Sequence, residues 1–115
     1  MKLINLEEAN KIIQETCDNY GINTIQYSEN DLVTCSERGE WDVACFHVEV
    51  KMNLAMSEEN YTTVATLSFP LRVRSMPNHM TPEEMKQFGD KCYAVAKCVE
   101  DLIEEFKDKA VMWEK

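Results

Sequence analysis

The sequence predicts an α+β fold, a two-layer sandwich in which an antiparallel four-stranded meander has one face covered by two helices. Three observations predict it: helical spacing of apolar residues at the start of the chain, two long alternating runs in its middle, and a second helical stripe towards its end. The predicted order is α-β-β-β-β-α, and a core of this size rarely splits, so residues 1–115 are expected to form a single domain.

The first helix is expected to begin after Asn5, which suits an N-cap, with Glu8 at the reciprocal position of a capping box. Gly21 provides a left-handed stop, which leaves room for about four turns. The apolar positions with helical spacing are Leu6, Ala9, Ile13, Cys17 and Tyr20. Two short strands, 22–28 and 31–36, are expected to follow.

A long hairpin is predicted from two consecutive runs of alternating apolar residues, 41–56 and 61–74. A four-residue loop between them would set Val50 opposite Leu67 and place the apolar members of every pair on one face. Pro70 cannot donate a hydrogen bond to a neighbouring strand, so the second strand is expected to lie at a sheet edge or to be bulged there.

The last helix has three start signals: Thr81 as the N-cap, Pro82 at the first helical position and Glu84 completing a capping box. It is expected to run to about residue 108, with an apolar stripe that would cover the sheet. The main stripe consists of Met85, Phe88, Cys92, Val95, Val99, Leu102 and Phe106. Val111, Met112 and Trp113 form an apolar tail, which suits either docking on the core or contact with a partner.

The composition restricts the classes of partner. With 21 acidic and 12 basic residues the net charge is −9, which disfavours direct binding of nucleic acid and favours a protein partner with a basic surface. No apolar run is long enough to span a bilayer, and the first residues do not resemble a signal peptide. Five cysteines without a CxxC pair then indicate reduced thiols and a cytoplasmic location.

Cys45, His47 and Glu49 alternate on one strand and would share a face, where a thiol, a base and an orienting carboxylate could form a nucleophilic site or begin a metal site. An open strand face offers no cleft and no exclusion of water, so an ordinary sheet surface is the favoured interpretation. The sequence therefore predicts no catalytic residue, no metal and no cofactor.

A second group on the same face suits contact with a protein partner, because tryptophan and arginine dominate binding hot spots. In the predicted hairpin Arg72 lies opposite Cys45, and Arg74 lies opposite Val43. The group, called here the sheet patch, consists of Trp41, Val43, His47, Arg72 and Arg74. The alternative is a strand end covered by the 22–36 hairpin or a tryptophan shielded by an arginine.

The outer face of the last helix carries a run of acidic residues spaced so that like charges are neighbours. This acidic ridge consists of Glu100, Asp101, Glu104, Glu105 and Asp108. It suits contact with a basic protein, even mimicry of nucleic acid, although such a run is also typical of a merely solvated face.

These features favour a small, acidic, intracellular, non-catalytic protein-binding module that acts on a basic partner, as an inhibitor of the nucleic-acid-mimic or phage anti-defence type or as a chaperone. Two alternatives stay open. One is a small enzyme or metal protein centred on Cys45 and His47, and the other is a homodimeric structural or accessory protein built on the last helix or on an edge strand.

Overall fold

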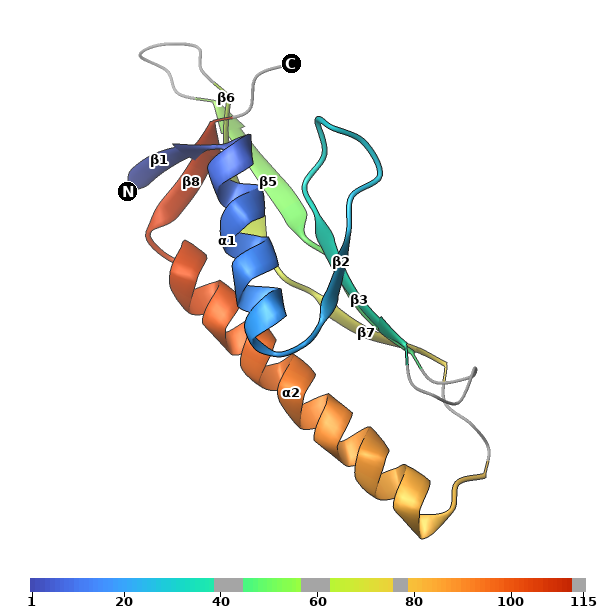
Figure 1. Cartoon of the computed structure of the whole chain (residues 1–115). Coiled ribbons are helices and arrows are strands. Elements are labelled where there is room, and N and C mark those ends of the chain that lie inside the picture. The colour runs from blue at the N-terminus through green and yellow to red at the C-terminus, as the bar shows by residue number, and fades with distance from the viewer. Residues whose placement is uncertain (39–44, 57–62, 76–78, 113–115) are drawn as a thin grey trace.

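Two helices lie on one side of a β-sheet layer in the computed structural model of the chain, which describes residues 1–38, 45–56, 63–75 and 79–112 (Figure 1). The helices are α1 (Leu6–Asn19) and α2 (Pro82–Phe106). The strands described are β1 (Lys2–Asn5), β2 (Asn23–Ile25), β3 (Thr34–Arg38), β4 (Cys45–Val48), β5 (Lys51–Met56), β6 (Thr63–Ser68), β7 (Leu71–Ser75) and β8 (Lys109–Met112). The predicted α+β class is confirmed.

The strands form two four-stranded sheets, which the prediction of a single antiparallel meander did not anticipate. One sheet has the order β1-β8-β6-β5, and β1 runs parallel to β8, so this sheet is mixed. The other has the order β2-β3-β4-β7 and is antiparallel throughout. The meander was wrong because strands β1 and β8, which flank the helices, were not predicted.

The predicted long hairpin is present as one β-ribbon whose two ends belong to different sheets. Its register differs by two residues from the predicted one: Met52, not Val50, lies opposite Leu67. The same offset places His47, not Cys45, opposite Arg72. From Phe46 onwards the offset is even and leaves the paired residues on their predicted faces, which is why alternation alone could not distinguish the two registers. The predicted loop, 57–60, lies outside the described residues.

The ribbon changes sheets at Pro70. The amide N–H of Glu49 donates a hydrogen bond to the carbonyl of Pro70 at 3.1 Å, but proline has no N–H with which to return the second bond of that pair. The pairing is interrupted there, between β6 and β7, and β7 continues as an edge strand of the antiparallel sheet. The expected edge position is confirmed for β7, whereas β6, the part of the predicted strand before Pro70, lies between β8 and β5 inside its sheet.

Helix α1 begins and ends where its sequence signals lie. The Asn5 side chain accepts a hydrogen bond from the amide N–H of Glu8 at 2.8 Å, as expected of an N-cap. Beyond the last turn Gly21 has a φ of 66°, a left-handed conformation that glycine adopts without the strain a Cβ would bring.

Helix α2 has the predicted capping box: the amide of Glu84 donates to the Thr81 hydroxyl, and the amide of Thr81 donates to the Glu84 carboxylate, each at 3.2 Å. The helix ends at Phe106, slightly before the predicted end. Lys109 Nζ donates to the Glu105 carbonyl at 2.7 Å and so satisfies a carbonyl of the last turn.

The core lies between the helices and the sheets. Ile4, Ala65 and Val111 are paired neighbours on three adjacent strands, and all are buried on the face that the helices cover. In the C-terminal tail Val111 is therefore part of the core, as the central strand β8 requires; Trp113 lies outside the described residues.

The apolar stripe of α2 is buried only in its second half. The buried members are Val95, Cys98, Leu102 and Phe106, whereas Met85 in the first turn is 62% exposed. The first half of the stripe is only partly covered: Phe88 and Cys92 are half-buried against the core, and the start of the helix extends beyond α1 (Figure 1).

Replacing Leu102 with alanine is expected to lower the free energy of unfolding by about 3 kcal/mol, because the side chain is fully buried and its removal leaves a cavity. The matched change in the next residue, Ile103→Ala, is expected to cost about 0.5 kcal/mol or less, since Ile103 is 54% exposed. Urea unfolding followed by circular dichroism measures both, and equal losses would contradict the placement of the core.

Candidate functional site

The structure describes only part of the predicted sheet patch. Trp41 and Val43 lie outside the described residues, as do the side chains of His47 and Arg74. His47 is in the central strand β4, with Ser36 of β3 on one side and Arg72 of the edge strand β7 on the other. Arg72 is exposed. The structure therefore brings two members of the patch, His47 and Arg72, to neighbouring strand positions.

Of the Cys45–His47–Glu49 group, the structure describes only the side chain of Glu49, while Cys45 and His47 are placed by their strand positions. Cys45 pairs with Arg38 on β3 and with Ser75 on β7, where the register of β4 shifts. Glu49 is half-buried, and its Oε2 lies 3.6 Å from Lys51 Nζ. Within the part of the chain that the structure describes, no group of three or more histidine, cysteine or acidic residues has a geometry that could hold a metal ion.

All five members of the acidic ridge are exposed, and each has a polar partner within the molecule. Lys97 lies 3.8 Å from Glu100, and Lys107 lies 2.6 Å from Glu104, which raises the pKa of Lys107. Lys109 lies 3.5 Å from Glu105 and 3.4 Å from Asp108. Exposed ion pairs of this kind contribute little stability, so they compete only weakly with an external cation.

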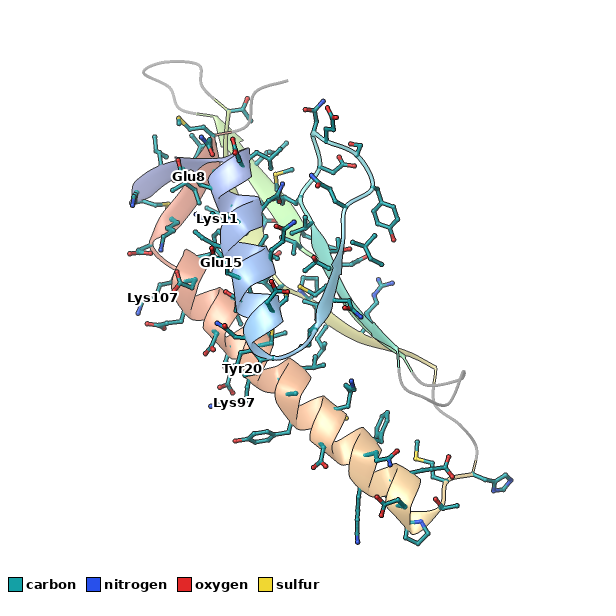
Figure 2. All side chains as sticks on the ribbon, in the orientation of Figure 1. Glu8, Lys11, Glu15, Tyr20, Lys97 and Lys107 are labelled. Atoms are coloured by element: carbon teal, nitrogen blue, oxygen red, sulfur yellow. The ribbon has the colours of Figure 1, made fainter. Side chains whose placement is uncertain are left out.

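The fifth member, Asp101, accepts a hydrogen bond from the hydroxyl of Tyr20 at the end of α1. This bond raises the pKa of Tyr20 to about 12, since a phenol that donates to a carboxylate loses its proton less readily. It also connects the solvent sides of the two helices, which lie next to each other (Figure 2).

The structure concentrates the charge of the chain on these two helices. Together α1 and α2 contain eleven acidic residues and four lysines, a net charge of −7 out of −9 for the whole chain. Figure 2 shows Glu8, Lys11 and Glu15 along α1, with Lys97 on the neighbouring helix α2 and Lys107 directly after its end. We call the exposed side chains of α1 and α2 the acidic layer. The sequence revealed only its α2 part, because the position of α1 beside that helix is a tertiary feature.

Sequence reasoning also missed a cluster of three thiols. Cys17 of α1, Cys35 of β3 and Cys98 of α2 are all buried, with Cys17 Sγ lying 2.7 Å from Cys35 Sγ and 3.8 Å from Cys98 Sγ. The apolar spacing of the helices placed Cys17 on a buried face, but Cys98 was not among the stripe residues and nothing local connects Cys35 to either helix.

Two thiols of the cluster, Cys17 and Cys98, hold their protons tightly. The hydrogen bond with Cys35, aided by burial, raises the pKa of Cys17 to about 12, and the bond with Cys17 together with burial raises the pKa of Cys98 further. Thiols of this kind are poor nucleophiles at neutral pH, because the thiolate is the reactive form.

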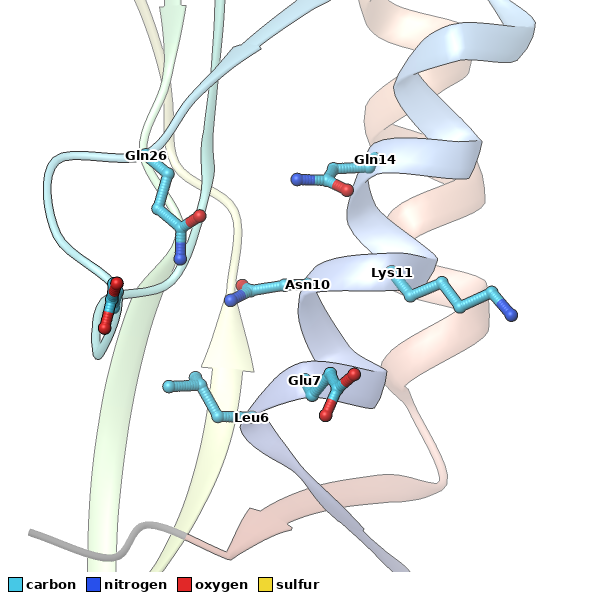
Figure 3. A pocket seen from close by; sticks show the side chains of 7 residues that line it. Leu6, Glu7, Asn10, Lys11, Gln14 and Gln26 are labelled. Carbon is cyan, nitrogen blue, oxygen red and sulfur yellow. The ribbon is translucent and has the colours of Figure 1, made fainter.

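An open cavity of about 610 Å³ lies between α1 and the segment that joins β2 to β3 (Figure 3). Asn10 and Gln26 both donate hydrogen bonds to the carbonyl of Asp31, at 3.1 and 3.2 Å, and the Asn10 carbonyl oxygen accepts one from the amide of Val33 at 3.0 Å. The Asn10 amide holds the segment to the helix, and the Gln26 bond closes the segment on itself. The described lining residues are carboxylates, amides, one lysine and one leucine, with no cysteine, histidine or serine among them.

A smaller cavity of about 300 Å³ lies between the end of α2 and strand β6. Its lining is largely apolar and includes the rings of Phe69 and Phe106, whose centroids are 5.6 Å apart. Ser68 and Lys107 are its only polar side chains among the described residues, and they do not make up a set of nucleophile, base and orienting group.

Neither helix is both long and apolar enough to cross a membrane, a finding that applies to the described residues. Comparison of the chain with protein-family models, with curated proteins and with solved structures finds no match.

Raising the pH from 8 to 10 under reducing conditions is expected to lower the free energy of unfolding. Thiols in the unfolded chain ionise near pH 9, whereas Cys17 and Cys98 stay protonated in the folded protein, so the stability they contribute is complete below pH 9 and is lost as the pH approaches their folded pKa values. The expected loss by pH 10 is on the order of 1 kcal/mol for each thiol.

Urea unfolding at each pH measures this dependence. A Cys17→Ala/Cys98→Ala variant is the control, since it lacks the two groups and is expected to show a flatter dependence over the same interval. Identical slopes for the variant and the unmodified protein would contradict the assignment to these thiols.

Proposed function

We propose that the chain is a non-catalytic protein-binding module that acts inside the cell and uses its acidic layer to bind a basic surface on another protein. The observation that carries the proposal is the concentration of −7 of the −9 charges on two neighbouring helices. A surface of one charge sign steers an oppositely charged partner and accelerates its association.

The acidic layer suits this role because its geometry is held in place before a partner arrives. The hydrogen bond from Tyr20 to Asp101 connects the helices on their solvent side, and the fully buried residues Ile13 and Leu102 belong to the core beneath them. Rigid presentation lowers the entropic cost of binding. The ion pairs of Glu100 and Glu104 with lysines are exposed, so their carboxylates can exchange an internal cation for one from the partner.

Two kinds of partner fit this surface. In a protein that binds nucleic acid, the carboxylates would occupy a channel built for phosphates, and the module would act as an inhibitor by mimicry. In a basic client protein, the same surface would act as that of a chaperone. The sheet patch of Trp41, Val43, His47, Arg72 and Arg74 stays a predicted second contact surface, and a reaction centred on Cys45 and His47, whose side chains lie outside the described residues, stays a predicted alternative.

Reversing two charges of the acidic layer, with Glu100→Lys and Glu104→Lys, is expected to weaken partner binding roughly tenfold or more, because each change removes an attraction and adds a repulsion. Asp101 is left intact so that its bond with Tyr20 is preserved. The partner is captured from an extract of the source organism on the immobilised protein, purified, and titrated against each variant at two salt concentrations.

The control variant, Glu29→Lys/Asp31→Lys, changes the net charge equally, but its positions lie in the segment between β2 and β3, beside α1 and on neither of the two helices that form the acidic layer. We expect it to bind like the unmodified protein, and circular dichroism checks that both variants are folded. Equal binding by all three proteins, or equal weakening by both variants, would refute a role for the acidic layer.

A homodimer is the second candidate, and the incomplete burial of α2 favours it. The radius of gyration is 16.2 Å, against about 13 Å for a compact chain of this length, and the molecule extends over 58 × 24 × 19 Å. Met85 and Tyr93 on the protruding half of α2 are largely exposed. In a dimer, this half of the helix would complete its apolar stripe against a second copy.

Sedimentation velocity at micromolar concentration tests the dimer. If α2 forms the interface, the unmodified protein sediments as a dimer and Met85→Glu shifts it to a monomer, because the change buries a charge in the contact. Gln87→Glu adds the same charge at an exposed position two residues further along the helix, outside the apolar stripe, and is expected to leave the dimer intact. A monomeric unmodified protein would remove this candidate.

A further inference from the structure

The three buried thiols come from three different elements and meet at one point of the core. Cys17 lies in the last turn of α1, Cys35 near the start of β3 and Cys98 in the buried half of α2. Their exposed fractions are 0%, 1% and 1%. Cys17 is the central member, because its sulfur contacts both of the others.

The two sulfur–sulfur contacts of Cys17 differ in how close they are to the length of a disulfide bond. Cys17 Sγ and Cys35 Sγ are 2.7 Å apart, so a movement of less than about 1 Å would bring them to the length of a covalent S–S bond. Cys98 Sγ donates a long hydrogen bond to Cys17 Sγ at 3.8 Å, too far for a bond to form without a larger movement. Cys92, the other cysteine whose side chain the structure describes, does not belong to the cluster.

We propose that Cys17 and Cys35 are the site of a reversible intramolecular disulfide, formed by exchange with a low-molecular-weight disulfide such as oxidised glutathione. The thiolate of one cysteine attacks the external disulfide, giving a mixed disulfide and releasing one small thiol. The second cysteine, as its thiolate, attacks the protein sulfur of that mixed disulfide and releases the other small thiol. Two protein thiols are oxidised, one external disulfide is reduced, and the protons pass to the two small thiols.

Cys98 is placed to exchange with this bond without any change in oxidation state. Its thiolate can attack the Cys17 sulfur and release Cys35 as a thiol, which would move the cross-link from α1–β3 to α1–α2. Both products tie α1 to another element of the core. Burial makes formation slow in the folded protein and likewise shields the bond from reductants once it has formed.

The Cys17–Cys35 bond would close a loop between residues that are 18 positions apart. A loop of this length restricts the unfolded chain enough to raise the midpoint of thermal unfolding by roughly 10 °C. The oxidised protein is therefore expected to melt higher than the reduced one, and treatment with a dithiol reductant is expected to reverse the shift.

Tryptic mapping distinguishes the products, because no lysine or arginine lies between Lys11 and Arg38. Cys17 and Cys35 therefore share one peptide, 12–38, which becomes two hydrogen masses lighter when they are bonded. A bond from Cys17 to Cys98 instead joins this peptide to 98–107. The full-length protein is equilibrated with oxidised glutathione, its remaining thiols are blocked by alkylation, and it is digested without a reductant.

The expected result is the lighter 12–38 peptide, with Cys92 recovered as an alkylated thiol. Cys98→Ala, the control variant, is expected to keep the bond and the rise in melting temperature, whereas Cys35→Ala is expected to show the linked 12–38 and 98–107 peptides. Should Cys35→Ala lower the folded fraction, the Cys98→Ala protein still decides the outcome. A reduced or merely glutathionylated 12–38 peptide in both the unmodified protein and Cys98→Ala would overturn the proposal.

Discussion

The missing N–H of Pro70 is the constraint on which the architecture depends. It interrupts the ribbon between β6 and β7, so the two strands of one long hairpin acquire different neighbours on either side of the interruption. On one side β6 lies inside a mixed sheet, and on the other β4 lies inside an antiparallel one. The helices pack over the first sheet and over the junction, and α1 also contacts β2 and Cys35 of β3 in the second sheet. The far end of the second sheet and the start of α2 extend beyond α1 (Figure 1).

Local signals predicted the parts of the fold that local chemistry determines. The caps at Asn5 and Thr81, the stop at Gly21 and the alternation of the hairpin all correspond to features of the structure. The offset of two residues in the hairpin could not be predicted, because it leaves the paired residues on the same face of the sheet as the predicted register does. Strands β1 and β8 were not predicted, because four residues are too few to show a period, and their pairing joins residues more than a hundred positions apart.

The candidate sites also include features that local sequence predicts and features that it does not. Exposure of the acidic ridge could be predicted from helical spacing, whereas the contribution of α1 to the acidic layer depends on tertiary packing that no local pattern encodes. The thiol cluster is the clearest example: Cys17 and Cys98 are far apart in the sequence, and only the pairing of α1 with α2 over β3 brings their sulfurs together. The face on which a residue lies within one helix or strand is thus predictable, whereas contacts between residues of different elements are not.

The central place of β8 in its sheet has a consequence for synthesis. β8 lies between β1, the first strand made, and β6, and it is the last of the described elements to leave the ribosome. Until it arrives, β1 has no strand to pair with, and one edge of β6 lacks its neighbour. This sheet therefore assembles only after translation has passed residue 112, so the nascent chain depends on contacts of high sequence separation that close slowly.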